Sequence, residues 1–191
     1  ALELIERQMG EGRESAAVEL RALGVAEAKI DAYFDAMPRR YFTAHTAREI
    51  ARHALVVLGL AGDRTFSTAV REHGDGGTEF ILCTKDVHGL FANVAGTLTA
   101  HDLNIASAHV YSMRTGMAVE IYRVSTPPGE ADEHREKWRG VEHSLARVLA
   151  GELEVRDLLR GRRHPLGRAR SPAHYPASVE VDAVLTAMIE A

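Results

Sequence analysis

Residues 83–91, which read CTKDVHGLF, decide the fold of this chain. They end an extended apolar run and pass through a short turn into a segment with apolar residues at helical spacing, namely Leu90, Val94 and Leu98. A strand, a compact turn and a helix therefore follow in this order. The first amide groups of such a helix lack partners within the helix, so they can bind an anion such as an α-carboxylate.

The residues downstream complete one structural unit. Residues 105–113 and 117–124 are strand candidates joined by a short glycine-containing connection, and an apolar stripe indicates a helix over about 132–150. Residues 178–181 form a short strand candidate after a long irregular stretch. The order from Thr78 is thus βαββαβ. This order predicts an α+β, ferredoxin-like fold with both helices on one face of an antiparallel sheet.

The segment upstream, residues 1–64, is expected to be helical. Two helices should precede Pro38, and Thr46 with Glu49 has the spacing of a capping box that begins a third helix. The chain starts inside this helical pattern without a methionine, so we expect it to be a piece of a longer protein.

A further strand candidate, residues 66–71, precedes the strand at 78–83. The residues between the two strands, Gly74-Asp75-Gly76-Gly77, accept the backbone angles of a tight reversal. The sequence therefore predicts a hairpin, whose first strand could extend the sheet within one chain.

Composition excludes several classes of protein. The 191 residues carry 23 Lys and Arg against 27 Asp and Glu, a net charge of −4, so neither nucleic acid nor a membrane surface is expected as a partner. The longest apolar run, residues 54–61, is far shorter than the roughly 20 residues that cross a bilayer. We expect a soluble cytoplasmic protein. One cysteine, Cys83, cannot build a disulfide framework or a Cys-rich zinc site.

Two polar side chains near the first helix could recognise a small zwitterion. Asp86 could meet an ammonium group, and Asn104 offers both a donor and an acceptor to an amide or a carboxylate. The alternative is ordinary turn chemistry, in which Asp86 only caps the helix, Gly89 only permits close packing and Asn104 only forms a turn. Both interpretations stay open on this pattern alone.

The pattern Asp86-x-x-Gly89-Leu90-Phe91, followed by Val94, Leu98, Asn104-Ile105 and Ala108, resembles the signature of the ACT domain. That family has a ferredoxin-like fold and commonly binds amino acids. The resemblance implies a ligand crevice between the turn and the start of the next strand, which a second ACT module could complete. Its candidate ligand-binding residues are Asp86, His88, Gly89, Leu90, Asn104 and Ile105. The family usually has proline where this chain has His88.

Two further stretches narrow the resemblance: Gly76-Gly77-Thr78-Glu79, and Arg40-Tyr41-Phe42 with His45, Thr46, Glu49 and His53. Together they resemble the C-terminal region of the bifunctional enzymes that uridylylate and deuridylylate the nitrogen regulatory protein PII. The resemblance implies that residues 1–64 close an HD-type phosphohydrolase domain and that residues 65–181 form an ACT domain. Residues 182–191 depart from the family and form an unassigned helix candidate.

This resemblance implies a regulatory role in nitrogen metabolism. Glutamine is the expected effector, and the expected partners are the parent enzyme's catalytic domains, the PII protein and a second copy in a homodimer. We expect no catalytic residue, metal or cofactor in this fragment, because the paired-aspartate motif that would hold magnesium for the parent's transferase is missing. The rival hypothesis is a structural ACT dimerisation module without a ligand.

Other conspicuous residues have plain structural interpretations. The only His-Asp doublet, His101-Asp102, lies at a helix end, and His45 and His53 are expected to pack or cap on their helix. Cys83 is expected to be a small buried apolar residue. A metal-dependent hydrolase built from the histidines ranks third among the functional hypotheses. The arginine-rich stretch 156–170 is expected to be a solvated loop, with docking of an acidic surface as the alternative.

Overall fold

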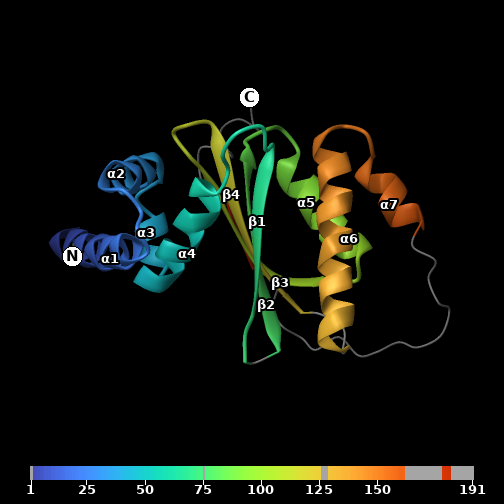
Figure 1. Ribbon diagram of the computed structural model, residues 1–191, viewed down its shortest axis with the longest axis horizontal. Coiled ribbons are helices and arrows are strands. Elements are labelled where there is room, and N and C mark those ends of the chain that lie inside the picture. Colours follow the sequence, from blue (N-terminus) through green and yellow to red (C-terminus); the bar gives the residue numbers. More distant parts are fainter. Residues whose placement is uncertain (1, 75, 126–128, 162–177, 182–191) are drawn as a thin grey trace.

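The computed structural model describes residues 2–74, 76–125, 129–161 and 178–181, and the side chains from residue 6 to residue 161 within those ranges (Figure 1). The elements follow in chain order: α1 (Leu2–Ala22), α2 (Glu27–Ala36), α3 (Tyr41–Ala44), α4 (Ala47–Leu58), β1 (Phe66–Glu72), β2 (Gly77–Lys85), α5 (Leu90–Ala100), β3 (Asn104–Ser112), β4 (Met117–Ser125), α6 (Ala131–Leu149), α7 (Val155–Gly161) and β5 (Ser178–Val181).

The strands form one sheet in the order β1-β2-β4-β3-β5. The first four strands pair antiparallel, whereas β5 pairs parallel to β3. The predicted α+β, ferredoxin-like fold is confirmed. The predicted hairpin is confirmed as well, and its first strand β1 lies at the edge beside β2. The short last strand, β5, lies at the opposite edge.

One face of the sheet is covered by α5 and α6, as the sequence predicts. Leu90, Val94 and Leu98 of α5 and Val141 and Leu145 of α6 are buried in one apolar core with the sheet. Trp138 belongs to the same core and stacks on Phe80, with ring centroids 5.3 Å apart. The regular apolar spacing of both helices therefore anchors them to the sheet.

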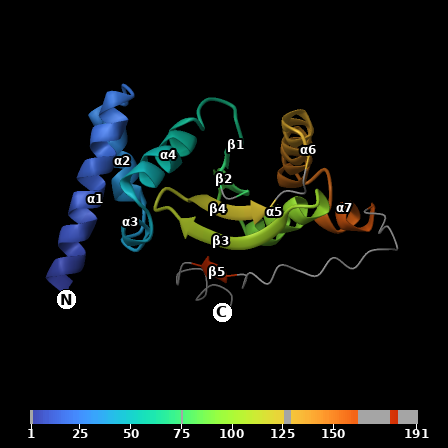
Figure 2. The same ribbon diagram turned by 90° about the horizontal axis from the view of Figure 1, so that it is seen from below.

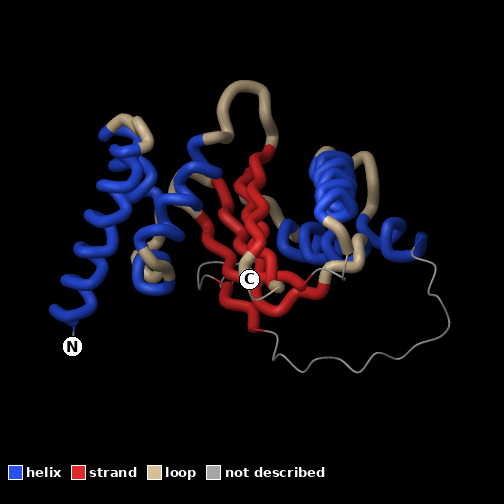
Figure 3. The backbone as a smooth tube through the Cα atoms, turned by 60° about the horizontal axis from the view of Figure 1, so that its bottom comes forward, coloured by secondary structure: helices blue, strands red, loops and turns tan. Residues whose placement is uncertain are grey.

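The other face of the sheet is covered by the N-terminal helical segment, α1–α4. Figures 2 and 3 show these helices on the side of the sheet opposite α5 and α6. Sheet residues such as Ile81, Val119 and Ile121 share a core with α1, α2 and α4. This face of the sheet is therefore covered within the chain.

The helical segment matches the predicted pattern with one addition. Two helices precede Pro38 and α4 begins with the predicted capping box, in which Thr46 and Glu49 bond each other's backbone amides. The four-residue helix α3 was not predicted, because it is too short for a periodicity signal. The helix candidate at 182–191 and most of the arginine-rich stretch lie outside the described residues.

Candidate ligand site and its connection to the helical segment

Hydrogen bonds hold the carboxylate of Asp86 in place in the turn between β2 and α5. The Ser112 hydroxyl, at the end of β3, donates to Oδ2 of Asp86 at 2.5 Å, and the Asp86 amide donates to the Gly116 carbonyl at 3.0 Å. Asp86 is only partly buried. Its carboxylate therefore lies at a defined position with a surface that solvent or a ligand can reach.

The helix that follows has an open N-terminus. Gly89 adopts a φ of +77°, a backbone conformation that residues with a Cβ rarely adopt, and no side chain caps this end of α5. Val87, His88 and Gly89 are exposed, whereas Leu90 is buried and anchors the first turn. The Leu90 amide already donates to the Val87 carbonyl at 3.1 Å, so the helix amides that the turn can present beside the carboxylate are those of Phe91 and Ala92.

A second carboxylate lies behind this turn. Glu120 of β4 is only 1 % exposed, and its Oε2 accepts a 2.5 Å hydrogen bond from the Tyr122 hydroxyl. Its Oε1 is buried and has no hydrogen-bond partner among the described residues. Burial, and to a lesser degree the negative charge of Asp86, raises the pKa of Glu120 to about 7.

Glu120 is not among the candidate residues that the sequence predicted. The available signal was its place in the strand MAVEIYRV, where a charged residue shares the inward alternation with Ala118 and Tyr122. The ring of Phe91 in α5 stacks on the ring of Tyr122, with centroids 6.0 Å apart. The Tyr122 hydroxyl that donates to Glu120 therefore belongs to a ring that packs against the first turn of α5.

Asn104 and Ile105 lie at the other end of the sheet. Asn104 pairs with Ser125 at the end of β4, whereas Ser112, which bonds Asp86, pairs with Ala118 near its start. Eight strand residues at about 3.3 Å each separate the two ends by roughly 26 Å. The predicted crevice between the Asp86–Leu90 turn and the Asn104-Ile105 strand start is therefore wrong for a single chain. When a strand, a helix and a second strand parallel to the first follow one another, the end of the first strand and the start of the second lie at opposite ends of the strands.

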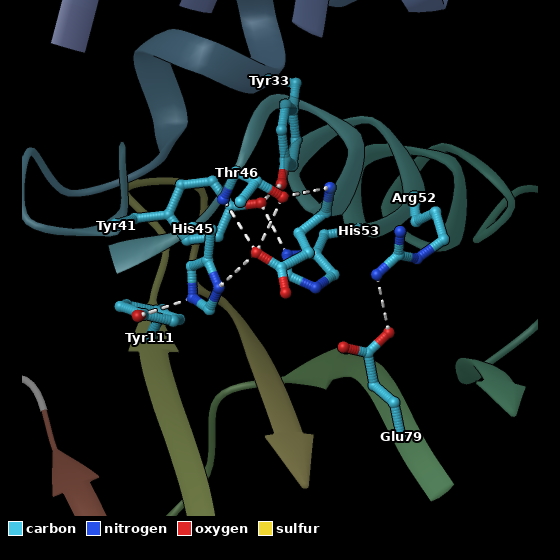
Figure 4. Close-up of polar contacts among 9 residues, drawn as sticks. Tyr33, Tyr41, His45, Thr46, Arg52, His53, Glu79 and Tyr111 are labelled. Carbon is cyan, nitrogen blue, oxygen red and sulfur yellow. Dashed lines mark hydrogen bonds and ion pairs between the residues drawn. The ribbon is translucent and has the colours of Figure 1, made fainter. Parts of the chain in front are cut away.

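A network of polar contacts connects the helices of the N-terminal segment to one another and to the sheet (Figure 4). The hydroxyls of Tyr33 and Tyr41 lie 2.7 Å apart, and the Tyr41 hydroxyl lies 2.8 Å from Nδ1 of His53. His53 is fully buried. Burial, followed by the charges of His45, Arg52 and His109, lowers the pKa of His53 well below its usual value, so this ring is neutral.

Three polar contacts cross from the helices to the sheet. Nε2 of His45 lies 2.9 Å from the Tyr111 hydroxyl, the Arg40 guanidinium donates to the Val110 carbonyl at 3.1 Å, and the Arg114 amide donates to the Ala36 carbonyl at 2.9 Å. The Arg40 guanidinium also lies over the Tyr111 ring at 5.0 Å.

An ion pair makes a fourth crossing contact. Arg52 of α4 reaches Glu79 of β2 at 3.3 Å, as Figure 4 shows, and Glu79 is 7 % exposed. Together the apolar core and these polar contacts fix the helical segment on the sheet.

The other candidate residues behave as structural groups. His45 and His53 pack and form hydrogen bonds, as expected from the sequence, and His101 lies 2.9 Å from the Ser144 hydroxyl. Among the side chains that the structure describes, no group of three or more His, Cys, Asp or Glu could hold a metal ion. Cys83 is buried, and burial raises the pKa of its thiol to about 11. Within the described ranges no helix is long and apolar enough for a membrane span.

Comparisons with known proteins agree with this architecture. A family profile described as "Uridylyltransferase GlnD fifth domain" matches residues 5–56, which lie within α1–α4. The bifunctional uridylyltransferase/uridylyl-removing enzyme of Azospirillum brasilense is 30 % identical over 145 residues, and that of Bordetella pertussis is 29 % identical over 174 residues. The enzyme of the same name from Vibrio vulnificus is 26 % identical over 146 residues.

The matches cover most of this chain and a small part of each relative. They include 74 %, 90 % and 74 % of the chain in these three cases, but only 16 %, 20 % and 17 % of the length of the relatives. Most of this chain is therefore related in sequence to the C-terminal part of the bifunctional uridylyltransferase/uridylyl-removing enzymes.

Proposed function

We propose that this chain is the regulatory, amino-acid-sensing part of a bifunctional uridylyltransferase/uridylyl-removing enzyme, with glutamine as its effector and the PII protein as the substrate of the whole enzyme. The observation that carries the proposal is the buried contact between α1–α4, most of which the family profile matches, and a sheet whose β2–α5 turn presents Asp86 and open helix amides. A ligand at this turn would act on a sheet to which the helices are firmly attached.

The mechanism is thermodynamic linkage. Glutamine that binds one arrangement of the regulatory and catalytic domains more tightly shifts the population toward that arrangement by the difference in affinity. Asp86 is connected through Ser112 to the end of β3, and Tyr111, the preceding residue, contacts His45 of the helical segment. These contacts provide a short path from the turn to the helices.

The ligand site in this proposal is shared between two modules. Asp86, His88, Gly89 and Leu90 come from one sheet, and Asn104 with Ile105 comes from a second copy or from a neighbouring module of the parent. The 26 Å separation, which follows from strand length at about 3.3 Å per residue, is the reason for this sharing. A homodimer is the simplest way to bring the two halves together.

The catalytic chemistry of the parent is assigned to parts outside this chain. We expect the fragment to be catalytically inactive and cytoplasmic, and magnesium to be needed only by the transferase domain of the parent.

Calorimetric titration of the chain with glutamine, with glutamate as the control ligand, tests the proposal. Glutamine should bind, and glutamate should bind more weakly because its second carboxylate adds repulsion near Asp86 and a desolvation cost. Asp86→Ala and Asn104→Ala should each weaken binding by about 1–3 kcal/mol. The exposed carboxylate of Asp157 provides a control, since Asp157→Ala should leave the affinity unchanged. Equal affinity in all variants would place the effector site elsewhere.

The second candidate function is a dimerisation module without a ligand. The separation of Asp86 from Asn104 within one chain favours this alternative, because neither end alone holds the complete set of polar groups. A chain that dimerises tightly and shows no heat of binding with glutamine would support it.

A further inference from the structure

The sheet has an open edge at β1. The His73 amide donates to the Gly77 carbonyl at 2.8 Å, and this bond fixes which residues of β1 bond β2. In the antiparallel register the bonded positions alternate, so Ser67, Ala69 and Arg71 face β2, while Thr68 and Val70 direct their backbone N–H and C=O groups away from the sheet. No described residue forms a backbone hydrogen bond with these outward groups of Thr68 and Val70.

A groove of about 480 Å³ lies beside this edge on the α4 side. Its apolar lining includes Leu55 and Val70, which are 42 % and 37 % exposed and belong to the few large apolar side chains that the described surface exposes. In Figures 1 and 2, β1 lies between α4 and α6. The residues that line the groove come mainly from α4 and from β1, the edge strand of the sheet.

The charge of the α4-side groove is positive. Arg52, Arg64 and Arg71 line it against a single carboxylate, Glu79, which Arg52 already pairs. Arg64 and Arg71 are exposed and form no ion pair with a described residue. A chain with a net charge of −4 therefore carries a local excess of two positive charges at this groove.

A second groove, of about 470 Å³, flanks the same strand on the α6 side. Val70 and Trp138 supply its apolar part. Most of its charged side chains form ion pairs: His134 with Glu72 at 3.3 Å, Arg139 with Glu136 at 3.8 Å, and Arg135 with Asp132. Glu142 accepts a hydrogen bond from the Thr68 hydroxyl at 2.6 Å. This groove is thus suited to apolar side chains and the α4-side groove to acidic ones.

We propose that the β1 edge binds an extended segment of another polypeptide, in which acidic and apolar side chains alternate. Successive side chains of an added strand point to opposite faces, so acidic ones would enter the α4-side groove and apolar ones the α6-side groove. The outward groups of Thr68 and Val70 supply the backbone hydrogen bonds. The opposite edge of this sheet already pairs with a segment of that composition, since β5 reads Ser-Val-Glu-Val and lies along β3.

The test uses the whole 191-residue chain and a seven-residue peptide that carries fluorescein at its N-terminus, fluorescein-Ser-Val-Glu-Val-Glu-Val-Ser-NH2, and binding is measured by fluorescence anisotropy. The acidic peptide should show saturable binding. A control peptide in which Lys replaces each Glu should bind at least about tenfold more weakly. An N-methylated version that cannot donate backbone hydrogen bonds should also lose binding.

Variants of the chain locate the site. The double change Arg64→Glu with Arg71→Glu should weaken binding of the acidic peptide by about tenfold or more. The single change Arg147→Glu, on an exposed part of α6, should leave that binding unchanged. Val70→Pro removes one outward N–H and spares the bonds to β2, and Val70→Thr keeps both the shape and the N–H. The Val70→Pro variant should lose peptide binding and the Val70→Thr variant should keep it. Circular dichroism and thermal unfolding check that both variants fold.

Several outcomes overturn the proposal. These are absence of saturable binding, equal affinity for the acidic and basic peptides, and unchanged affinity in the double arginine variant. A chain that dimerises in sedimentation and becomes monomeric on Val70→Pro would identify the edge as an interface between two copies instead. Glutamine titration is independent of this site, so failure here leaves the proposed sensor function untouched.

Discussion

Glu120 shows how one residue in a core can make stability depend on pH. Its folded pKa is raised by burial to about 7 from the usual 4.5, so the folded state binds its proton more tightly than the unfolded state does. The stability that this provides is fully present below pH 4.5 and is lost as the pH rises toward 7. The loss is up to roughly 3 kcal/mol, because each unit of pKa shift corresponds to about 1.4 kcal/mol.

Glu120→Gln should therefore stabilise the chain at pH 8 and change it little at pH 4.5. The glutamine carbonyl can still accept the hydrogen bond from Tyr122, and no charge has to be buried. Urea unfolding of both proteins at the two pH values measures the difference. A variant that is less stable than the wild type at pH 8 would mean that a partner in the folded chain compensates the buried carboxylate.

His53 has the opposite pH dependence. Its folded pKa is lowered, so the folded state excludes a proton that the unfolded state binds below about pH 6.5. Its contribution is present above that pH and decreases as the pH falls, by at most about 1.4 kcal/mol per unit. His53→Gln keeps a partner for the Tyr41 hydroxyl and should reduce the loss of stability between pH 7 and pH 5.

The pH windows of Glu120 and His53 overlap with opposite signs, so the informative quantity is the difference between variant and wild type. The exposed His143 serves as a control, because His143→Gln should leave the slope of stability against pH unchanged. A slope in His53→Gln that equals the wild-type slope would mean that folding does not lower the pKa of His53.

At the level of elements, α4 holds the residues that connect the helices to the sheet. Thr46 and Glu49 form the capping box at its start, and Arg52 and His53 follow one turn later. Thr46→Ala should lower the free energy of unfolding by about 1 kcal/mol, because the Glu49 amide loses its side-chain acceptor. Thermal or urea unfolding measures the loss. Thr115→Ala in the exposed β3–β4 turn is the control, and an equal effect in both would exclude capping as the cause.

The sequence predicted most elements because their signals are local. Gly116 lies in the turn between β3 and β4 with a φ of +79°, which few other residues adopt, and the turn was predicted from that glycine. The spacing of Leu90, Val94 and Leu98 predicted α5 in the same way. By contrast, α3 was missed since four residues cannot display a helical period.

At the scale of the whole molecule, the helical segment α1–α4 covers the sheet face opposite α5 and α6 (Figure 2). Because α1–α4 cover it within the chain, this face does not need a partner copy. The remaining physical reason for a dimer is the distance between the two halves of the proposed glutamine site.

A site shared between two copies makes dimerisation of the chain depend on glutamine. If two copies share the site, glutamine binds the dimer more tightly than the monomer and should shift the equilibrium toward the dimer. Sedimentation equilibrium with and without glutamine should show a higher average mass in its presence, and glutamate should have a smaller effect. Glutamine that binds without changing the mass would locate the complete site within one chain.

By itself, the sequence determined the order βαββαβ, the hairpin before it, the capping box of α4 and the turn that carries Asp86 and Gly89. Each of these depends on residues within a few positions of one another, where periodicity and turn preferences act. Only the tertiary structure decided that Asn104 lies at the far end of the sheet from Asp86, that α1–α4 cover the second face, and that Glu120 is buried beside Tyr122. These facts depend on strand pairing and burial between residues far apart in the chain. The alternation along β4 groups Glu120 with Ala118 and Tyr122 but does not show its contacts, and the element order implies the position of Asn104 only once β2 and β3 are known to run parallel in one sheet.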